Sequence, residues 1–245
     1  MIILIFFGLL IGFLVSMIGL GGGVFFIPLL VLIYDIEPAS AVGISIFAML
    51  GVNISSTISY FFQKKIDIKL SLLYDIFDIP GVIIGAALTS LLFPKMLLIF
   101  CSIIIISLGI LLLFYKNLKF VKNKKKLGFK NYVIASISSL FGGLITGLSG
   151  MGGGTTDTAT MSLLGIPFSK AVGSSEFAML LTNIFGFIVH NYMGNIKYDL
   201  ALPLFIGSLI GATIGSIYAK KIKANILRKI LSIFVIILGI RLLFY

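Results

Sequence analysis

The chain is poor in the residues that build disulfides, metal sites and nucleophilic active sites. It holds one cysteine, Cys101, and one histidine, His190, which are far apart and belong to no recognisable motif. A single cysteine excludes an internal disulfide and a cysteine-rich metal site. An enzyme would need a nucleophile with a base, or a set of metal ligands. We therefore expect no enzyme, no cofactor and no bound metal ion.

Charge is also scarce, and apolar residues take its place. Charged residues make up 11% of the 245 residues and hydrophobic residues 59%, with a mean hydropathy of +1.20. Several windows of about 17–25 residues carry almost no charge, which is the length needed to cross a hydrocarbon core of about 30 Å. A soluble domain cannot bury that much apolar surface. The sequence predicts an all-α polytopic membrane protein with the lipid bilayer as its partner.

The net charge of +11 has two explanations. A strongly basic chain can bind nucleic acid, but membrane proteins also concentrate lysine in their cytoplasmic loops. We favour the second, since much of the lysine falls in the segment 116–131, and we expect no nucleic-acid partner. The first 18 residues resemble a signal peptide but lack a basic start and a small-residue cleavage pattern, so we keep them in the mature protein.

The second half of the chain repeats the first. The segment 41–54 aligns with 171–184, and ten of the fourteen positions are identical. Glycine clusters at 19–23 and 150–154 stand at nearly the same offset. Ordered matches of this kind indicate an internal repeat. We predict a first repeat at 1–115, a cytoplasmic lysine-rich linker at 116–131 and a second repeat at 132–245.

Each predicted repeat contains five apolar segments. The second of these, at 24–34 and at 155–165, is too short to span a bilayer as a helix. With the glycine turn before it, it predicts a re-entrant or broken helix pair beside three transmembrane helices. The other segments lie at 2–18, 39–62, 70–93 and 95–115, and at 132–149, 171–193, 199–219 and 225–244.

Counting cationic residues predicts that the two repeats are inverted. With an odd number of crossings in each half and the linker inside, 16 of the 19 cationic residues face the cytoplasm, and only Lys95, Lys197 and Arg241 face outward. Parallel repeats would leave only 12 of the 19 inside. The positive-inside rule therefore favours inversion. Inverted repeats with broken helices are typical of secondary transporters that bind substrate near the midplane.

The glycine turns predict an anion site. A helix N-terminus offers unpaired N–H groups and partial positive charge, and glycine lets the backbone approach a ligand closely. Two such turns could face each other across one cavity. The alternative is that the glycines only allow close helix packing, as we expect for Gly81-x-x-x-Gly85 and Gly207-x-x-x-Gly211. The predicted substrate-binding residues at the turns are Gly21, Gly22, Gly23 and Val24, and Gly152, Gly153, Gly154 and Thr155.

A polar stripe on the third segment of each repeat could complete the site. Small neutral side chains recur there at helical spacing, and they can hold oxyanion oxygens without a permanent charge. Hydrogen bonding between helices is the alternative role. We predict substrate contacts for Ser45, Asn53, Ser175 and Asn183, on faces that also carry Met49, Ser56 and Tyr60 or Met179, Gly186 and His190.

Four acids fall within predicted membrane segments, where ionisable groups are costly and usually functional. Glu176 shares the polar face of its segment and is the first candidate for proton coupling. Asp157 is the second, although it could instead cap a helix start. Asp75 and Asp78 could simply lie near the cytoplasmic interface beside Lys69. His190 could carry a proton or form an interfacial hydrogen bond.

Glycine motifs recur at matching places in the two halves. They are Gly8-x-x-x-Gly12, Gly19-x-Gly-Gly-Gly23, Pro28 and Ala41-Val-Gly43, and then Gly143-x-x-x-Gly147, Gly150-x-Gly-Gly-Gly154 and Ala171-Val-Gly173. Ala159 stands where the first half has Pro28, so that element is not symmetric here. With these motifs the chain resembles the TauE/SafE sulfite-exporter family over nearly its whole length. The resemblance implies an inner-membrane carrier of sulfur-containing anions such as sulfite, thiosulfate, sulfoacetate or other sulfonates.

Together these features predict a secondary transporter that moves a small anion by alternating access. No nucleotide-binding motif is present, so protons, another ion or the substrate gradient would drive it. The main alternative is a cation transporter that binds Na⁺, H⁺ or a divalent ion through the intramembrane acids. A subunit or scaffold without transport activity is a further alternative.

Overall fold

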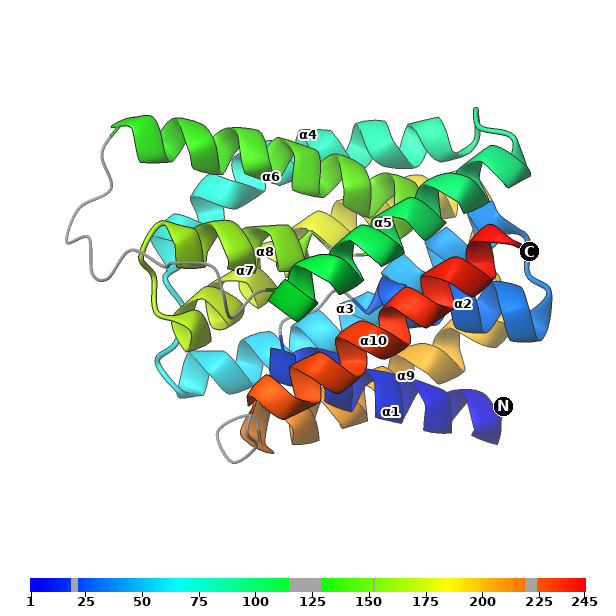
Figure 1. The fold of residues 1–245 in the computed structure, drawn as a ribbon, viewed down its shortest axis with the longest axis horizontal. Helices are drawn as coiled ribbons and strands as arrows, with labels where there is room; N and C mark the ends of the chain where they lie inside the picture. Colours follow the sequence, from blue (N-terminus) through cyan, green and yellow to red (C-terminus); the bar gives the residue numbers. More distant parts are fainter. Residues whose placement is uncertain (19–21, 115–128, 152, 219–223) are drawn as a thin grey trace.

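The computed structural model describes residues 1–18, 22–114, 129–151, 153–218 and 224–245. Over these residues the chain forms ten α-helices and no strand (Figure 1). Gly21, Gly152 and most of the predicted linker lie outside the described residues. The helices are α1 (Ile2–Ile18), α2 (Gly23–Tyr34), α3 (Pro38–Phe62), α4 (Ile68–Thr89), α5 (Pro94–Phe114), α6 (Phe129–Ser149), α7 (Gly154–Leu163), α8 (Phe168–Tyr192), α9 (Tyr198–Tyr218) and α10 (Ala224–Leu243).

The prediction of an all-helical membrane protein is confirmed. Six described helices are long and apolar enough to cross a membrane, namely α3, α4, α5, α6, α8 and α9. Large apolar side chains such as Ile76, Phe141 and Ile233 are exposed on the outside of the molecule, as expected of a surface that faces lipid. The helices α2 and α7 have 12 and 10 residues, so neither is long enough to span a bilayer.

The long helices run roughly along one axis, and both chain termini lie at the same end of it (Figure 1). The connections α3–α4 and α7–α8 lie at the opposite end, whereas α2–α3, α4–α5 and α8–α9 turn at the end with the termini. At that end the hydroxyl of Tyr245 donates to the carboxylate of Asp35, which raises the pKa of the tyrosine. The short helix α2 occupies the half nearer the termini, and α7 the other half.

Two helix pairs approach so closely that only glycine fits between them. On α9, a Cβ at Gly211 would stand 2.0 Å from the Leu9 carbonyl oxygen of α1. On α6, a Cβ at Gly143 would stand 2.1 Å from the Asp78 carbonyl oxygen of α4. Small residues at these crossings let membrane helices pack through their backbones. The packing role expected for the Gly81 and Gly207 motifs is therefore observed, in contacts that join the first half of the chain to the second.

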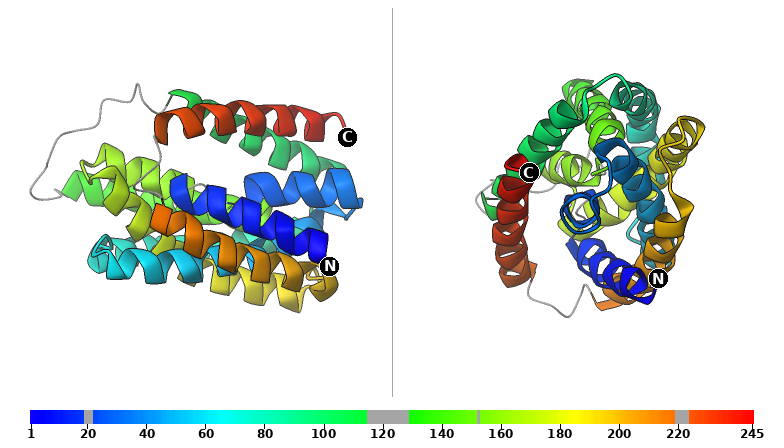
Figure 2. Two further views of the ribbon diagram at one scale, coloured as in Figure 1. Left: turned by 90° about the horizontal axis from the view of Figure 1, so that it is seen from below. Right: turned by 90° about the vertical axis from the view of Figure 1, so that its right-hand side faces the viewer.

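The centre of the molecule is formed by α3 and α8, which pack against each other. In an apolar stretch of 18 residues within α3, 83% of the residues are buried, compared with 39% in the corresponding stretch of α5. Seen end-on, α5 and α10 lie together at one side of the molecule (Figure 2). The polar stripes of α3 and α8 are therefore enclosed by protein rather than exposed to lipid.

Candidate functional site

The starts of α2 and α7 meet in the middle of the molecule. A Cβ on Gly23 would stand 2.0 Å from the carbonyl oxygen of Gly150 and 2.5 Å from the Cα of Met151. Gly150 has φ +60°, a left-handed conformation that glycine adopts without strain. The two glycine turns thus touch through their backbones, and an anion held by both helix starts would lie beside this contact.

Each turn also forms a hydrogen bond with a side chain on the polar stripe of α3. The Gly22 N–H donates to the sulfur of Met49 over 2.9 Å, and the Ser45 hydroxyl donates to the Gly150 carbonyl over 2.8 Å. A thioether is a weak acceptor, so an anion oxygen would be a stronger partner for the same N–H. Val24, which follows on α2, is fully buried. The first turn therefore presents at least one backbone donor that an anion could take over.

The second turn has a similar setting with more hydroxyl groups. The Gly153 N–H donates to the Thr146 hydroxyl over 2.5 Å. A Cβ on Gly154 would stand 3.3 Å from Cγ of Met179, the methionine that aligns with Met49. Thr155, at the start of α7, is 6% exposed. Ser175 lies nearby and shares a 2.7 Å hydrogen bond with Thr158.

The two predicted asparagines are in direct contact. The Asn183 amide donates to Oδ1 of Asn53 over 2.6 Å, and the Asn53 amide donates to Oε2 of Glu176 over 2.9 Å. All three side chains are at most 4% exposed. A buried network of this kind fixes the relative position of α3 and α8. The structure therefore brings Asn53, Asn183 and Glu176 together, while Ser45 and Ser175 contact the glycine turns or their helices.

His190 lies in the last turn of α8, where its side chain is buried and hydrogen-bonded. Its Nε2 lies 3.0 Å from the carbonyl oxygen of Gly147, and its Nδ1 lies 3.2 Å from the amide nitrogen of Asn195. Its side chain has no exposed surface. Both ring nitrogens are thus engaged by protein groups, which is consistent with a role in holding α6 against α8.

The capping role considered for Asp157 is wrong, and the neighbouring acids of α4 are enclosed by protein. Asp75 and Asp78 are 3% and 0% exposed within α4. Asp157 does not cap α7: the N-cap is Gly153 without a side-chain hydrogen bond, and among the described residues the Asp157 carboxyl group has no hydrogen-bond partner. Asp78 and Asp157 instead face each other beside Gly142. Burial of unpaired carboxyl groups is costly, which makes this cluster a candidate functional site.

The Ala-Val-Gly motifs have a role that the sequence did not reveal. A Cβ on Gly43 would stand 2.8 Å from the carbonyl oxygen of Asn195, in the α8–α9 connection. A Cβ on Gly173 would stand 2.5 Å from the carbonyl oxygen of Lys65, in the α3–α4 connection. Each glycine thus lets the connection of the other half cross close to a central helix. A shared motif at aligned positions was the signal that could have pointed to this pairing.

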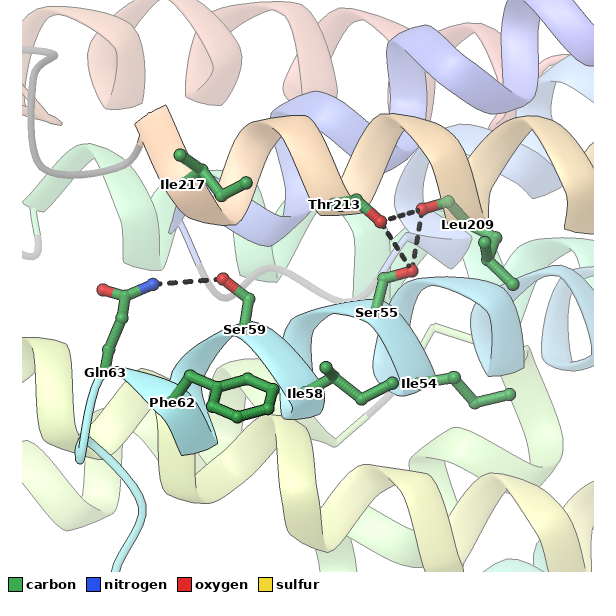
Figure 3. Close-up of a pocket in the computed structure, with 9 residues that line it drawn as sticks. All are labelled: Ile54, Ser55, Ile58, Ser59, Phe62, Gln63, Leu209, Thr213 and Ile217. Atoms are coloured by element: carbon green, nitrogen blue, oxygen red, sulfur yellow. Dashed lines mark hydrogen bonds between the residues drawn. The ribbon is translucent and has the colours of Figure 1, made fainter.

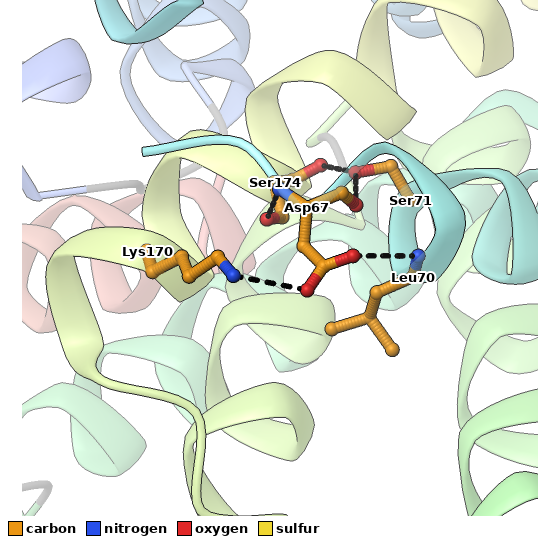
Figure 4. Close-up of polar contacts among 5 residues, drawn as sticks. All are labelled: Asp67, Leu70, Ser71, Lys170 and Ser174. Atoms are coloured by element: carbon orange, nitrogen blue, oxygen red, sulfur yellow. Dashed lines mark hydrogen bonds and ion pairs between the residues drawn. The ribbon is translucent and has the colours of Figure 1, made fainter. Parts of the chain in front are cut away.

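A polar cluster ties α8 to the start of α4 (Figure 4). The Asp67 carboxylate forms a 3.0 Å ion pair with Lys170 and accepts a hydrogen bond from the Leu70 N–H. The Asp67 N–H donates to the Ser174 hydroxyl, and the Ser71 hydroxyl donates to the Ser174 carbonyl, both over 2.8 Å. Both ends of the ion pair are partly exposed, so its contribution to stability is modest.

Two grooves on the outside of the molecule do not suit an anion. The larger, of about 680 Å³, lies between α3 and α9 (Figure 3). Its hydroxyl groups already have protein partners: Ser55 donates to the Leu209 carbonyl, Thr213 donates to Ser55, and Ser59 accepts from the Gln63 amide. Its remaining surface is mainly Ile54, Ile58, Phe62 and Ile217. The smaller groove, between α1, α2 and α10, is lined almost entirely by apolar side chains.

Comparison with known proteins identifies the family. The family model described as "Sulfite exporter TauE/SafE" matches residues 4–242. The chain belongs to this family. It is 27% identical to "Probable membrane transporter protein YunE" of Bacillus subtilis, over 99% of this chain and 97% of that protein. It is 27% identical to "Probable membrane transporter protein YdhB" of the same organism, over the whole of both chains. No solved structure matches the chain.

Proposed function

We propose that this membrane transporter carries small sulfur-containing anions, such as sulfite, thiosulfate, sulfoacetate or other sulfonates, by alternating access. The observation that carries the proposal is the meeting of two helix starts at the centre of the molecule, where Gly23 touches Gly150. Helix N-termini favour negative charge, and two of them act on the same small region. The sulfur chemistry rests on membership of the TauE/SafE family.

In this proposal the two halves form inverted repeats, 1–115 and 132–245. Support comes from α2 and α7, which begin at the centre and run to opposite ends of the molecule (Figure 1). Equivalent contacts also recur: α1 packs on α9 as α6 packs on α4, and α3 packs on α9 as α8 packs on α4. Alternating access would then arise by movement of the two repeats around a central substrate.

The proposal also sets the orientation in the inner membrane. The α3–α4 connection carries Lys64 and Lys65, and Lys170 lies at the start of α8, all at the end opposite the termini. The end with the termini has Lys95 at the start of α5 and Lys197 before α9. By the positive-inside rule, the first end would face the cytoplasm and both termini would lie outside.

The anion would bind beside the Gly23–Gly150 contact, within reach of the Asn53–Asn183 pair. Donors for its oxygens would come from the backbone of Gly22, Gly23 and Val24, and of Gly153, Gly154 and Thr155. Ser45 and Ser175 would supply hydroxyl groups. Glu176 and Asp157 would bind the coupling proton. The site needs no cationic side chain, because the backbone supplies the positive potential.

A cation transporter is the second candidate, and one observation favours it. Such a protein needs acids from both halves at one place, and Asp78 and Asp157 meet that requirement. Against a metal ion, the described residues hold no group of three or more histidine, cysteine, aspartate or glutamate side chains placed to bind one. The acids therefore fit coupling to an anion better than capture of a metal ion.

Transport by purified protein in proteoliposomes tests this proposal. We expect saturable uptake and counterflow with sulfite, thiosulfate or a sulfonate, and weaker transport of sulfate. Asn183→Leu should reduce anion flux, while Ser102→Ala, which removes a hydroxyl bonded to the Leu98 carbonyl of its own helix, should not. Saturable Na⁺ or Ca²⁺ flux without anion flux would contradict the proposal.

A further inference from the structure

A second polar centre lies apart from the Asn53–Asn183 pair. Asp78 comes from α4 in the first half of the chain, and Asp157 comes from α7 in the second half. Their Oδ1 atoms lie 3.4 and 3.5 Å from the point where a Cβ on Gly142 would stand, so both carboxyl groups converge on the same spot of α6. Both side chains have no exposed surface.

Neither carboxyl group has a donor in the described part of the chain. The neighbouring hydroxyl groups are occupied: Thr156 donates to the Gly153 carbonyl over 2.6 Å, and Ser139 donates to the Tyr74 carbonyl over 2.5 Å. An ionised carboxylate can only accept hydrogen bonds, so two facing carboxylates repel each other. A proton held by one of them would turn the same contact into an O–H···O hydrogen bond.

The unpaired hydroxyl of Tyr74 is a second observation that points to a change of protonation at this centre. Tyr74 is fully buried on α4 beside Asp78 and Asp157, and within the described ranges its hydroxyl has no hydrogen-bond partner. A buried, unpaired hydroxyl costs free energy unless a state exists in which it is bonded. When the pair releases its proton, this O–H can donate to the ionised carboxylate.

The other titratable groups on the surrounding helices have hydrogen-bond partners of their own. Asp75 on α4 lies close to Asp78 and receives a weak 3.4 Å hydrogen bond from Thr182 of α8. On α8, Glu176 is bonded to Asn53, and His190 to Gly147 of α6. The described part of α6 presents Ser139 and Gly142 to the cluster rather than a charged side chain.

We propose that the Asp78–Asp157 pair binds one proton that is carried together with the anion. This inference rests on the proposed function and makes that pair, rather than Glu176, the coupling site. The proton adds to one carboxylate oxygen from the aqueous phase on one side, is shared with the other carboxylate, and leaves to the opposite side. A proton suits the pair better than a metal ion, which would need several more oxygen ligands.

The position of Asp157 explains why proton and anion would move in the same direction. Asp157 lies in the first turn of α7, where the helix N-terminus favours one negative charge. An ionised Asp157 and a bound anion compete for the positive potential at the N-terminus of α7. Protonation of the pair removes the competition, so each bound species strengthens binding of the other. The coupled cycle is therefore cotransport.

Infrared spectroscopy of the purified protein tests proton binding without any transport assay. We expect the wild type to show a protonated-carboxyl C=O band that shifts in heavy water and disappears on raising the pH. Asp78→Asn and Asp157→Asn should each remove the same component of this band, because an Asn amide donates to the remaining carboxylate as the protonated acid does. The exposed Asp199 provides the control: Asp199→Asn should leave the band unchanged. A band that is unchanged in both pair variants would overturn the inference.

Transport measurements then test coupling. One proton per monovalent anion supports up to about tenfold accumulation for each pH unit of gradient. Asp78→Asn should abolish this accumulation, because the remaining carboxylate no longer shares a proton, while Asp199→Asn should keep it. Accumulation that follows a Na⁺ gradient, or that survives in Asp78→Asn, would overturn the inference. If the wild type carries no anion, the proposed function fails, and the infrared result still reports whether the pair binds a proton.

Discussion

Asn53 and Asn183 stand at aligned positions in the two halves of the chain and hydrogen-bond to each other over 2.6 Å. Contact between equivalent residues is expected where a two-fold axis relates two repeats. Only one of the two amides also reaches an acid, since Asn53 donates to Glu176, whereas Ile46 aligns with Glu176 in the first half. The two aligned asparagines thus differ in the charge that lies beside them.

Asn53→Ala and Asn183→Ala should each weaken both transport and stability. Hydrogen bonds between membrane helices contribute about 0.6 kcal/mol on average and at most about 1.7 kcal/mol. Because the two side chains share one bond, the double variant should lose less than the sum of the single variants. Thermal unfolding in detergent measures this coupling. Purely additive losses would mean that the contact does not connect α3 and α8 energetically.

The two glycine turns should respond differently to the same substitution. Gly23→Ala would place a Cβ 2.0 Å from the backbone of Gly150, which cannot move aside easily. Gly154→Ala would meet only the flexible side chain of Met179 at 3.3 Å. We expect Gly23→Ala to lose folded protein and Gly154→Ala to fold with near-normal stability, as judged by size-exclusion chromatography and thermal unfolding. Equal tolerance at both positions would mean that the turns are not in contact.

Several parts of this architecture followed from the sequence. Apolar segments predicted helices whose ends agree with the structure within a few residues; the segment 24–34 corresponds to α2 at Gly23–Tyr34. The short second segments were correctly predicted because glycine interrupts the hydrophobic run before each. The polar stripes are buried as their helical spacing suggested, since neutral hydrogen-bonding groups are rarely exposed to lipid.

The acidic cluster could not be predicted in the same way. Asp78 and Asp157 are 79 residues apart in the sequence and occupy positions that do not align between the repeats. Their contact depends on how closely α4 packs against α6, and Gly143 allows that approach by lying against the Asp78 carbonyl oxygen. Hydrophobic periodicity places residues on a face of a helix but does not say which helix meets that face.

At the end opposite the termini, the cap formed by Asp67 should matter more than its ion pair. Asp67→Asn keeps a side-chain oxygen for the Leu70 N–H and loses only the charge that faces Lys170. We expect a stability loss of about 0.2–1 kcal/mol, smaller at high salt. Asp67→Ala also removes the cap, which adds about 1 kcal/mol. Chemical denaturation at two salt concentrations measures both, and equal losses would contradict a capping role.

Met49 should control how readily the first turn accepts an anion. Its sulfur accepts the Gly22 N–H at 2.9 Å, so an anion that binds this N–H must displace it. Met49→Leu keeps a similar apolar volume and offers no acceptor, so the N–H is left free. We therefore expect a lower KM for the transported anion with little change in stability. Initial rates of uptake over a range of anion concentrations measure the KM.

Met179 supplies the matched control for this prediction. It aligns with Met49 and lies against Gly154, but it approaches the Cβ position of that glycine mainly through its Cγ atom. Within the described residues Met179 accepts no N–H, so Met179→Leu should leave the KM near the wild-type value. If Met49→Leu raises the KM, the sulfur helps to hold the substrate instead of competing with it. If both variants leave the KM unchanged, the Gly22 N–H does not bind the anion.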